Sequence, residues 1–342
     1  MTTDRAPGAE PSPLSEPVDR SELAEQLEEL LLGGRRRHTR VQAAELAGIS
    51  LEQASRLWNA LGFASVADDE IAFTDNDVTA LANAAGLVSA GLVDSASLQS
   101  VTRMVGQSMS QLAEWQARLL LELLAARPEL VGADPAGLTA FIGQLEPVLE
   151  QVQVHVWRRQ LAAASQRLLD SGVDPGSDTL AVGFADLAGY TSLSRQVGVS
   201  ELSTVLEEFE MLAAELIAKQ QGRVVKTIGD EVLFVAGTAA AAAEIALSLQ
   251  ERAGLDGRLP PLRIGLALGS VLARFGDVYG PVVNIASRLT GLARIGTVLV
   301  DQQLASALAS DPNYSLRRMR PASVRGYQHL SASRLRRSSD NG

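Results

Sequence analysis

The chain has 342 residues, enough for about two domains of roughly 150 residues each. Hydrophobic residues make up 46% and charged residues 20%, a composition typical of folded globular proteins. There are no cysteines, which excludes disulfide scaffolds, thiolate metal sites and cysteine nucleophiles. The net charge of −10 disfavours broad binding to nucleic acid. No signal peptide or apolar run of about 20 residues is visible, so we expect a cytoplasmic protein without a transmembrane segment.

Lysine is rare in this chain. Of the 30 basic residues only two are lysines, Lys219 and Lys226, and the other 28 are arginines. An ammonium group is a compact point charge, whereas a guanidinium is a planar fork. In such a background, a lysine indicates a candidate position for a compact cation in place of a guanidinium.

The N-terminal half is expected to be helical. Residues 1–20 contain four prolines and predict a disordered leader, whereas residues 21–170 predict an all-α domain. Near its end, apolar residues spaced 4-3-4-3-4 predict a helix with Asp134 as N-cap and a kink at Pro147. The stripe fits either a core-facing helix or a dimer seam, and it comprises Leu138, Ile142, Leu145, Leu149, Val152 and Val156.

Residues 41–62 are typical of a helix-turn-helix, which raises the alternative of a DNA-binding regulator. The basic segment 35–38 just before it is suited to phosphate contacts. We favour the interpretation that this motif serves helix packing, because the whole chain is acidic. The same half contains His38 and His155, whose side chains titrate near neutral pH and offer a candidate pH switch.

Residues 171–178 are rich in Gly, Pro, Asp and Ser and predict a linker, after which the periodicity changes. The core order that follows is β-α-β-β-α-β, which predicts a ferredoxin-like sheet with helices on one face, within a second domain of residues 179–330. We expect residues 331–342 to form a flexible tail. The expected strands are 179–186, 223–235 (a hairpin turning at Gly229-Asp230), 262–273, 297–300 and 314–318, and the expected helices are 200–220, 239–251 and 281–292.

Two carboxylates occur at positions where this order of strands and helices brings the ends of strands together. Asp186 ends the first strand, and Asp230 lies 44 residues later at the turn of the hairpin. Taken alone, each aspartate is also a common residue at a strand end or in a turn. Because the hairpin should lie beside the first strand, the two side chains would be neighbours. Paired carboxylates suit Mg²⁺ or Mn²⁺, which bind oxygen ligands.

A third segment carries Asp277, followed by a helix that begins at Pro281. Asn284 and Arg288 are four residues apart, so they share one face of that helix. Taken alone, the two side chains could equally form a polar surface stripe.

Together the three segments resemble class III nucleotidyl cyclases, the adenylyl and guanylyl cyclase family. The resemblance covers about residues 179–330 and implies an α+β fold, with a cyclase catalytic domain preceded by an all-α regulatory domain. It implies that Asp186 and Asp230 bind two Mg²⁺ or Mn²⁺ ions per site. It also implies that Lys226 and Asp277 select the purine.

The same resemblance implies that Asn284 and Arg288 stabilise the transition state. It places Arg325 in a region where relatives often carry a lysine that touches the terminal phosphates. It further implies a head-to-tail homodimer, in which each site takes residues from both chains, and an N-terminal domain that restrains the catalytic dimer. The activity expected is conversion of ATP to 3′,5′-cyclic AMP and pyrophosphate.

The choice of ATP also follows from hydrogen-bond chemistry. Lys226 only donates and ionised Asp277 only accepts, which matches N1 and the 6-amino group of adenine and mismatches guanine. Relatives that use GTP usually carry an acid at the lysine position and a small residue at the aspartate position.

Two alternatives stay open from the residues. One is a non-catalytic cyclase-like signalling module with DNA-binding helices, which the complete set of six site residues disfavours. The other is a diguanylate cyclase, because Ile228-Gly-Asp-Glu-Val232 is close to the Gly-Gly-Asp-Glu-Phe signature. The segment 283–288 follows the class III pattern and disfavours that second alternative.

Overall fold

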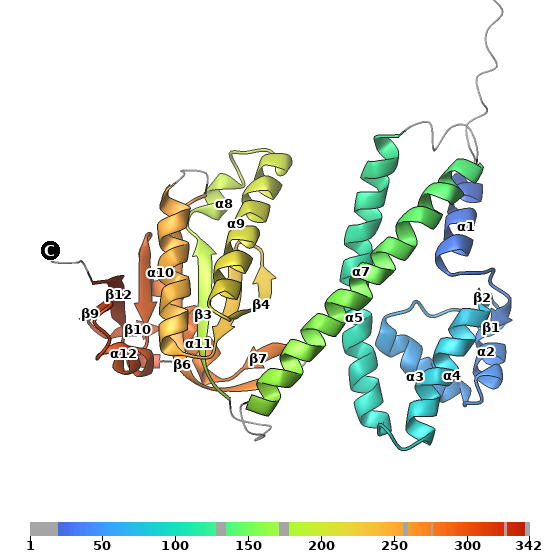
Figure 1. Cartoon of the computed structure of the whole chain (residues 1–342), viewed down its shortest axis with the longest axis horizontal. Coiled ribbons are helices and arrows are strands. Elements are labelled where there is room, and N and C mark those ends of the chain that lie inside the picture. The colour runs from blue at the N-terminus through green and yellow to red at the C-terminus, as the bar shows by residue number, and fades with distance from the viewer. Residues whose placement is uncertain are drawn as a thin grey trace, which may run out of the picture. The chain divides into compact units, whose positions relative to one another are not determined.

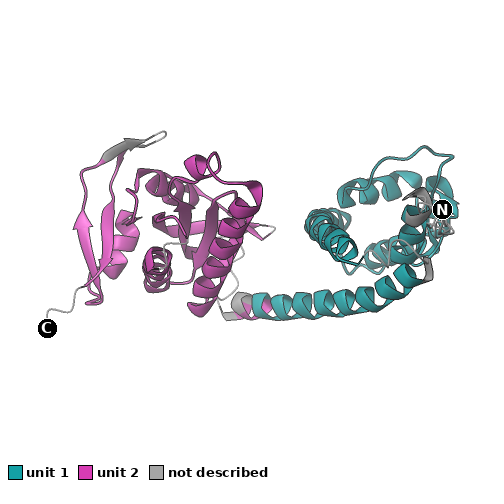
Figure 2. Cartoon of the chain, turned by 90° about the horizontal axis from the view of Figure 1, so that it is seen from above, with its two compact units in different colours: residues 1–164 teal, residues 165–342 magenta. Residues whose placement is uncertain are grey.

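The computed structural model describes residues 20–127, 135–170, 178–255, 259–274, 276–324 and 327–338. The chain divides into two compact units, residues 1–164 and 165–342 (Figure 2). The division falls within helix α7 (Pro135–Asp170), ahead of the expected linker. The leader up to residue 19, Asp134 and residues 171–177 lie outside the described residues. Among those described, no helix has the length and apolar character that a membrane span requires.

The first unit is helical with one small sheet (Figure 1). Besides α7, its helices are α1 (Arg20–Leu31), α2 (Arg40–Leu46), α3 (Leu51–Leu61), α4 (Asp75–Ser89) and α5 (Ser95–Ala125). The prediction of an all-α domain is incomplete, because β1 (His38–Thr39) and β2 (Ile71–Phe73) form an antiparallel pair. Two strands of two and three residues leave too short a pattern in the sequence to be recognised.

Capping boxes fix the starts of three of these helices. Thr39, Ser50 and Thr74 each accept a hydrogen bond from the backbone of the third helical residue, whose side chain bonds back to the cap. The ring of Trp58 on α3 stacks on Phe73 of β2 with centroids 4.4 Å apart. The helix-turn-helix segment therefore contributes to a packed core in this unit.

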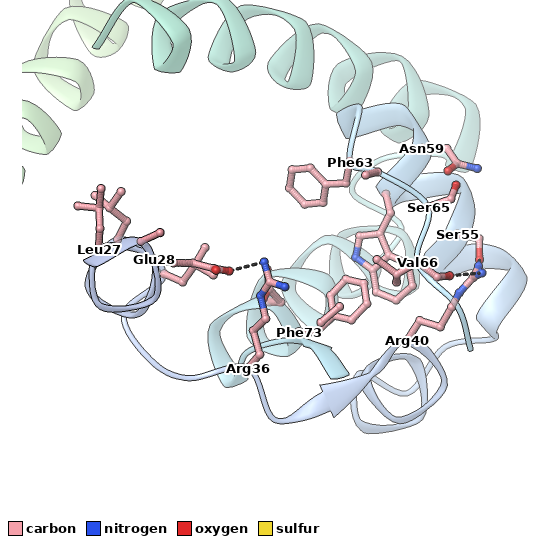
Figure 3. Close-up of a pocket in the computed structure, with 17 residues that line it drawn as sticks. Leu27, Glu28, Arg36, Arg40, Ser55, Asn59, Phe63, Ser65, Val66 and Phe73 are labelled. Atoms are coloured by element: carbon pink, nitrogen blue, oxygen red, sulfur yellow. Dashed lines mark hydrogen bonds and ion pairs between the residues drawn. The ribbon is translucent and has the colours of Figure 1, made fainter. Parts of the chain in front are cut away.

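A cavity of about 570 Å³ adjoins Trp58 and Phe73 (Figure 3). At its edge Arg36 pairs with Glu28, and Arg40 donates to the Ser55 hydroxyl at 2.5 Å. The three consecutive arginines that begin with Arg35 all pair with acids of the same unit: Arg35 with Glu29, Arg36 with Glu28, and Arg37 with Asp75. These residues, which the DNA-binding alternative assigns to phosphates, already have acidic partners.

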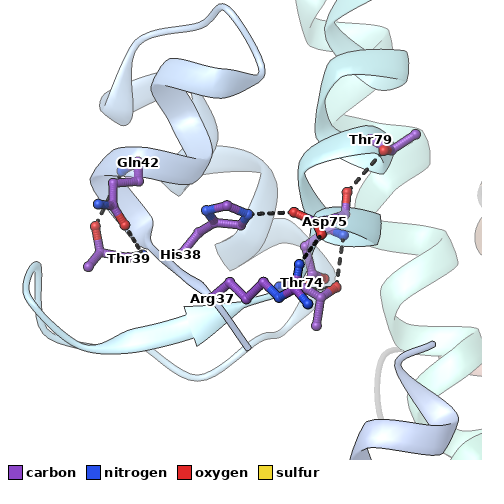
Figure 4. Close-up of polar contacts among 8 residues, drawn as sticks. Arg37, His38, Thr39, Gln42, Thr74, Asp75 and Thr79 are labelled. Carbon is purple, nitrogen blue, oxygen red and sulfur yellow. Dashed lines mark hydrogen bonds and ion pairs between the residues drawn. The ribbon is translucent and has the colours of Figure 1, made fainter. Parts of the chain in front are cut away.

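His38 is tied to the start of α4. Its Nε2 lies 2.7 Å from Oδ1 of Asp75, and a guanidinium nitrogen of Arg37 lies 3.5 Å from Oδ2 (Figure 4). The hydrogen bond with His38 lowers the pKa of Asp75 below its ordinary value. The contact joins β1 to the first turn of α4.

The apolar stripe on α7 has two different environments. Leu138 and Ile142 are buried with Leu124 of α5. Val152 and Val156, further along the same stripe, are 54% and 49% exposed. The core-facing interpretation is therefore correct for the first turns of the helix. The helix continues as an α-helix through Pro147.

The second unit is built on one large sheet, as expected from the order β-α-β-β-α-β. Its strands are β3 (Asp178–Leu187), β4 (Arg223–Ile228), β5 (Glu231–Ala236), β6 (Leu262–Arg274), β7 (Asp277–Tyr279), β8 (Thr297–Val300), β9 (Tyr314–Arg318) and β12 (Ser333–Arg337). They are ordered β4-β5-β3-β6-β8-β12-β9, and β7 extends β6. A separate hairpin joins β10 (Ala322–Val324) to β11 (Tyr327–Leu330).

The two helices of the β-α-β-β-α-β core, α9 (Val199–Lys219) and α10 (Ala239–Leu255), lie on one face of the sheet, as predicted, and α11 (Pro281–Leu292), which follows that core, covers the other face. Helix α12 (Gln302–Leu308) packs on the same face as α9 and α10. A short helix, α8 (Tyr190–Leu193), follows β3. The physical reason that both faces are covered lies in β3, where Ala181 and Ala185 are buried on the first face and Val182 and Phe184 on the second.

Residues 333–337 were expected in a flexible tail, and this prediction is wrong. They form β12, which pairs with β8 on one side and β9 on the other. Leu335 is buried, and Arg337 donates to Glu244 and Glu251 of α10. A strand reading Ser-Arg-Leu-Arg-Arg has a single apolar residue, which is too little to distinguish it from a solvated tail.

The placement of α11 depends on one glycine. A Cβ at Gly265 on β6 would lie 2.3 Å from the Thr290 amide nitrogen and 2.4 Å from the Ala286 carbonyl oxygen. Both are backbone atoms of α11, which cannot yield as a flexible side chain does. We therefore expect Gly265→Ala to lower the free energy of unfolding by about 1–3 kcal/mol, measured by urea denaturation. Gly254→Ala on α10, where a Cβ meets nothing, serves as control, and equal losses in both variants would contradict the prediction.

Candidate active site

The site is centred on the end of β3. In the antiparallel register, Asp186 lies opposite Glu231 of β5 on one side and Arg263 of β6 on the other. Side chains alternate along a strand, so Asp186 follows Val182 and Phe184 onto the face that α11 covers. Strand pairing thus sets one guanidinium and two carboxylates side by side.

Asp230 joins this group through the hairpin turn between β4 and β5. Gly229 adopts a left-handed φ of 64°, which allows the tight turn. The Leu187 amide then donates to the Asp230 carbonyl at 3.1 Å, which fixes the turn against the end of β3. The structure therefore brings Asp186 and Asp230 together, as the strand order predicted.

The electrostatics of this cluster are unfavourable without a further cation. A guanidinium nitrogen of Arg263 lies 2.5 Å from Oδ2 of Asp186. Even so, burial and the neighbouring Asp230 raise the pKa of Asp186, while Arg263 opposes them. Burial, Asp186 and Asp230 raise the pKa of Glu231 to about 7. One guanidinium thus faces three carboxylates.

The donor set fits a hard divalent cation. Carboxylate oxygens are the ligands that Mg²⁺ and Mn²⁺ prefer, and a cation would relieve the repulsion that raises the pKa of Glu231. Within the described part of the chain, no three His, Cys, Asp or Glu side chains are arranged to hold a metal by themselves. Asp186 and Asp230 would therefore hold an ion together with water or substrate oxygens, which is how Mg²⁺ is usually bound.

Lys226 and Asp277 form a second pair. Nζ of Lys226 on β4 lies 2.6 Å from Oδ2 of Asp277, which begins β7, and the Val278 amide donates to Oδ1 at 2.8 Å. Arg223 strengthens the link between these strands by donating to the Gly276 carbonyl at 2.7 Å. Partial burial raises the pKa of Asp277, but the hydrogen bonds from Lys226 and Val278 dominate and lower it overall. Asp277 is therefore held as an ionised acceptor.

Asn284 and Arg288 lie on the exposed side of α11. The opposite side of the helix is buried against the sheet through Val282, Ala286 and Leu289. The Thr290 hydroxyl donates to the Ala286 and Phe184 carbonyls, which ties α11 to β3. The two polar residues are therefore presented to solvent on a firmly seated helix.

The structure thus brings together the members of each predicted pair. Among the described residues, no hydrogen bond or ion pair connects one of these pairs to another. Arg325 lies outside the described residues. The sequence did not predict that Arg263 and Glu231 lie on either side of Asp186. Glu231 is visible in the sequence as the neighbour of Asp230, but Arg263 becomes visible only through the register of β3 with β6.

This sheet, with its carboxylate pair and α11, defines a nucleotidyl cyclase catalytic domain. The family described as the adenylate and guanylate cyclase catalytic domain matches residues 174–335. An adenylate cyclase of Streptomyces coelicolor is 46% identical over 301 residues, which are 87% of this chain and 79% of the relative. An adenylate cyclase of Glutamicibacter nicotianae is 40% identical over 318 residues, 88% of this chain and 79% of the relative.

A third relative is a pH-sensitive adenylate cyclase of Mycobacterium tuberculosis. It is 33% identical over 287 residues, which are 80% of this chain and 71% of the relative. All three matches extend well beyond the catalytic domain into the N-terminal half. The chain belongs to the class III adenylyl cyclases.

The raised pKa of Glu231 predicts a pH-dependent stability. Glu231 titrates near 4.5 in the unfolded chain and near 7 in the folded chain, so between these values the folded state binds more protons. Stability in EDTA should therefore fall as the pH rises from about 4.5 to 7. We expect Glu231→Gln to reduce the fall in melting temperature between pH 5 and pH 8, measured by thermal denaturation. The exposed Glu210→Gln is the control, and an unchanged pH profile in Glu231→Gln would refute the prediction.

Proposed function

We propose that the protein converts ATP to 3′,5′-cyclic AMP and pyrophosphate by attack of the ribose 3′-hydroxyl on the α-phosphate. The observation that carries the choice of substrate is the pair formed by Lys226 and Asp277, whose polar atoms lie 2.6 Å apart. The adenylate cyclases among the relatives support the same reaction.

Adenine selection rests on the chemistry of this pair. Lys226 would donate to N1, and Asp277 would accept from the 6-amino group. Guanine carries a donor at N1 and an acceptor at position 6, so it would face two mismatches. Each buried group left without a partner costs about 1–3 kcal/mol. The ion pair holds the two side chains close together before the base arrives.

Phosphoryl transfer would depend on the other two pairs. Asp186 and Asp230 would hold two divalent ions, Mg²⁺ or Mn²⁺. When bound, such ions lower the pKa of the attacking hydroxyl and neutralise the triphosphate. Arg288 would meet the charge that develops on the α-phosphoryl oxygens, and Asn284 would orient the ribose. Arg325 would contact the terminal phosphates.

We propose that the working enzyme is a head-to-tail homodimer with two equivalent sites. One chain would supply the metal-binding carboxylates and its partner would supply the purine-selecting and transition-state residues. Two features support this arrangement. No interaction joins the three pairs within the described part of one chain, and Asn284 and Arg288 are exposed.

We further propose that residues 21–170 regulate the catalytic unit, with inhibition as the resting effect. The relatives support a joint function of the two units, because the similarity continues through both of them. The pH-sensitive relative among them supports an activity that responds to conditions. The long helix α7, which belongs to both units, offers a direct covalent path between them.

Purified protein with Mn²⁺ and either ATP or GTP, analysed for the cyclic product, tests the proposed reaction. We expect cyclic AMP from ATP and little cyclic product from GTP. In the double variant Lys226→Glu with Asp277→Ser, the ratio of ATP to GTP turnover should fall by at least about 100-fold, because about 1.4 kcal/mol lost at each position is tenfold.

The matched control for this variant is Lys219→Glu, which reverses the charge of the only other lysine in the sequence. Lys219 is exposed and lies at the end of α9. Its nucleotide preference should equal that of the unchanged protein. Absence of cyclic AMP from the unchanged protein would refute the proposed reaction. An unaltered preference in the double variant would refute the assignment of the purine-selecting pair.

Mixing two inactive variants tests the dimer. Asp186→Ala and Arg288→Ala chains should each be inactive alone, because every site in either homodimer lacks one group. In a mixed dimer one site carries both changes and the other is intact. After subunit exchange at equal concentrations, we expect about a quarter of the unchanged activity. No recovery, with mixed dimers demonstrated by two affinity tags, would contradict the head-to-tail arrangement.

Removal of the N-terminal unit tests the proposed regulation. A truncated chain that begins at Gly172 retains the whole sheet and the α9–α10 core. We expect its specific activity to exceed that of the full chain at equal dimer concentration. Equal or lower activity, with the dimer confirmed by light scattering, would count against inhibition by residues 21–170.

A further inference from the structure

Positive charge is concentrated at one end of this acidic chain. Residues 294–338 contain eight arginines and only two acidic residues, Asp301 and Asp311, whereas the whole chain carries a net charge of −10. This region includes β8, β9 and β12, which form the end of the sheet farthest from β4 in the strand order (Figure 1). The metal-binding carboxylates lie on β3 and the β4–β5 turn, in a different part of the sheet.

Strand register places three of these arginines on one face. Arg334 of β12 lies directly opposite Arg317 of β9, and Arg336 is two residues further along β12. Leu335 and Arg337, which alternate with them, point to α10 on the opposite face. Arg334, Arg336 and Arg317 therefore share the face on which α11 packs. Arg294 follows Ala293, which packs in one cluster with Leu299. Because Leu299 of β8 lies opposite Arg334, Arg294 adjoins the same group.

These four residues, which we call the arginine face, have no acidic partner in the part of the chain that the structure describes. Among the described residues, none of the ion pairs or hydrogen bonds involves a guanidinium of Arg294, Arg317, Arg334 or Arg336. The Nε of Arg334 is buried and has no hydrogen-bond partner. Arg337, only one residue away from the group, is by contrast bound to Glu244 and Glu251. Within the described ranges, the strand therefore has a paired arginine on one face and unpaired arginines on the other.

Like charges held together without partners are unfavourable. Arginines directly opposite one another on neighbouring strands repel, and a buried donor without an acceptor adds a further cost. Burial, followed by the charges of Arg336, Arg317 and Arg294, lowers the pKa of Arg334. The guanidinium nevertheless remains protonated at neutral pH, because its ordinary pKa is so high. A bound anion would relieve both the repulsion and the unsatisfied donor.

We propose that the arginine face binds a small multivalent phosphate anion, such as pyrophosphate or the triphosphate of a nucleotide. Guanidinium groups bind phosphate oxygens through paired N–H donors, and exposed Arg317, Arg336 and Arg294 surround the half-buried Arg334. The patch extends over two strands, which suits a small ligand. A nucleic acid or an anionic membrane would extend beyond the patch and bring its phosphates against the rest of a chain whose net charge is −10. This binding site is separate from the proposed reaction.

Titration calorimetry with pyrophosphate in EDTA, using the full chain, tests the proposal. The variant is Arg317→Gln with Arg336→Gln, two exposed positions outside the active site. We expect pyrophosphate to bind the double variant at least tenfold more weakly than the unchanged chain. The control Arg252→Gln removes an exposed arginine from α10 and should bind within twofold of the unchanged chain. Cyclase activity should be the same in all three proteins.

The melting temperature is a second measurement. It separates anion binding by these arginines from a role of the arginines in folding. Without anion, the double variant should melt at the same temperature as the unchanged chain or higher, because repulsion is relieved. Pyrophosphate should raise the melting temperature of the unchanged chain and the control more than that of the double variant. A lower melting temperature of the double variant without anion would assign these arginines to folding and overturn the proposal.

Further ligands distinguish the sources of the anion. Orthophosphate should bind more weakly than pyrophosphate and ATP, and adenosine should not bind at this face. A preference for ATP over pyrophosphate would identify a nucleotide site, and the reverse a site for the inorganic anion. The proposal is overturned if pyrophosphate does not bind, if it binds the double variant and the control equally, or if only phosphatidylglycerol vesicles bind.

Discussion

The antiparallel register of β3 with its two neighbours is the constraint on which the site depends. It sets Asp186 between Glu231 and Arg263, and the hairpin turn at Gly229 adds Asp230. Burial keeps these charges close together in a medium that screens them poorly. The raised pKa values of Asp186 and Glu231 follow directly, and so does the affinity for a divalent cation that we propose.

The remaining parts of the site are positioned by the same sheet. The β4–β5 hairpin presents Lys226, β6 continues into β7 and Asp277, and α11 rests on β6 where Gly265 leaves room for it. One stiff scaffold thus positions the residues that we propose to bind metal, select the purine and stabilise the transition state. The arginine face lies on a different part of this scaffold, which allows an anion to bind there without occupying the active site.

Much of the catalytic unit could be predicted from the sequence, because its strands are apolar and its motifs are local. The pairing of Asp186 with Asp230 followed from strand order, and the shared face of Asn284 and Arg288 from helical spacing. Arg263 was missed because its importance comes from register with a strand 77 residues away. β12 was missed because it has one buried residue, Leu335. The face that α11 covers was not predicted, because helix order does not specify a side of the sheet.

Direct measurement of Mn²⁺ binding tests the central claim, that strand register builds a metal site from Asp186 and Asp230. The full chain is titrated with Mn²⁺ in the presence of an ATP analogue that cannot cyclise, and free Mn²⁺ is followed by electron paramagnetic resonance. We predict that Asp186→Asn and Asp230→Asn each weaken binding at least tenfold, while Glu210→Gln leaves it unchanged. Equal Mn²⁺ binding by all four proteins would contradict the claim.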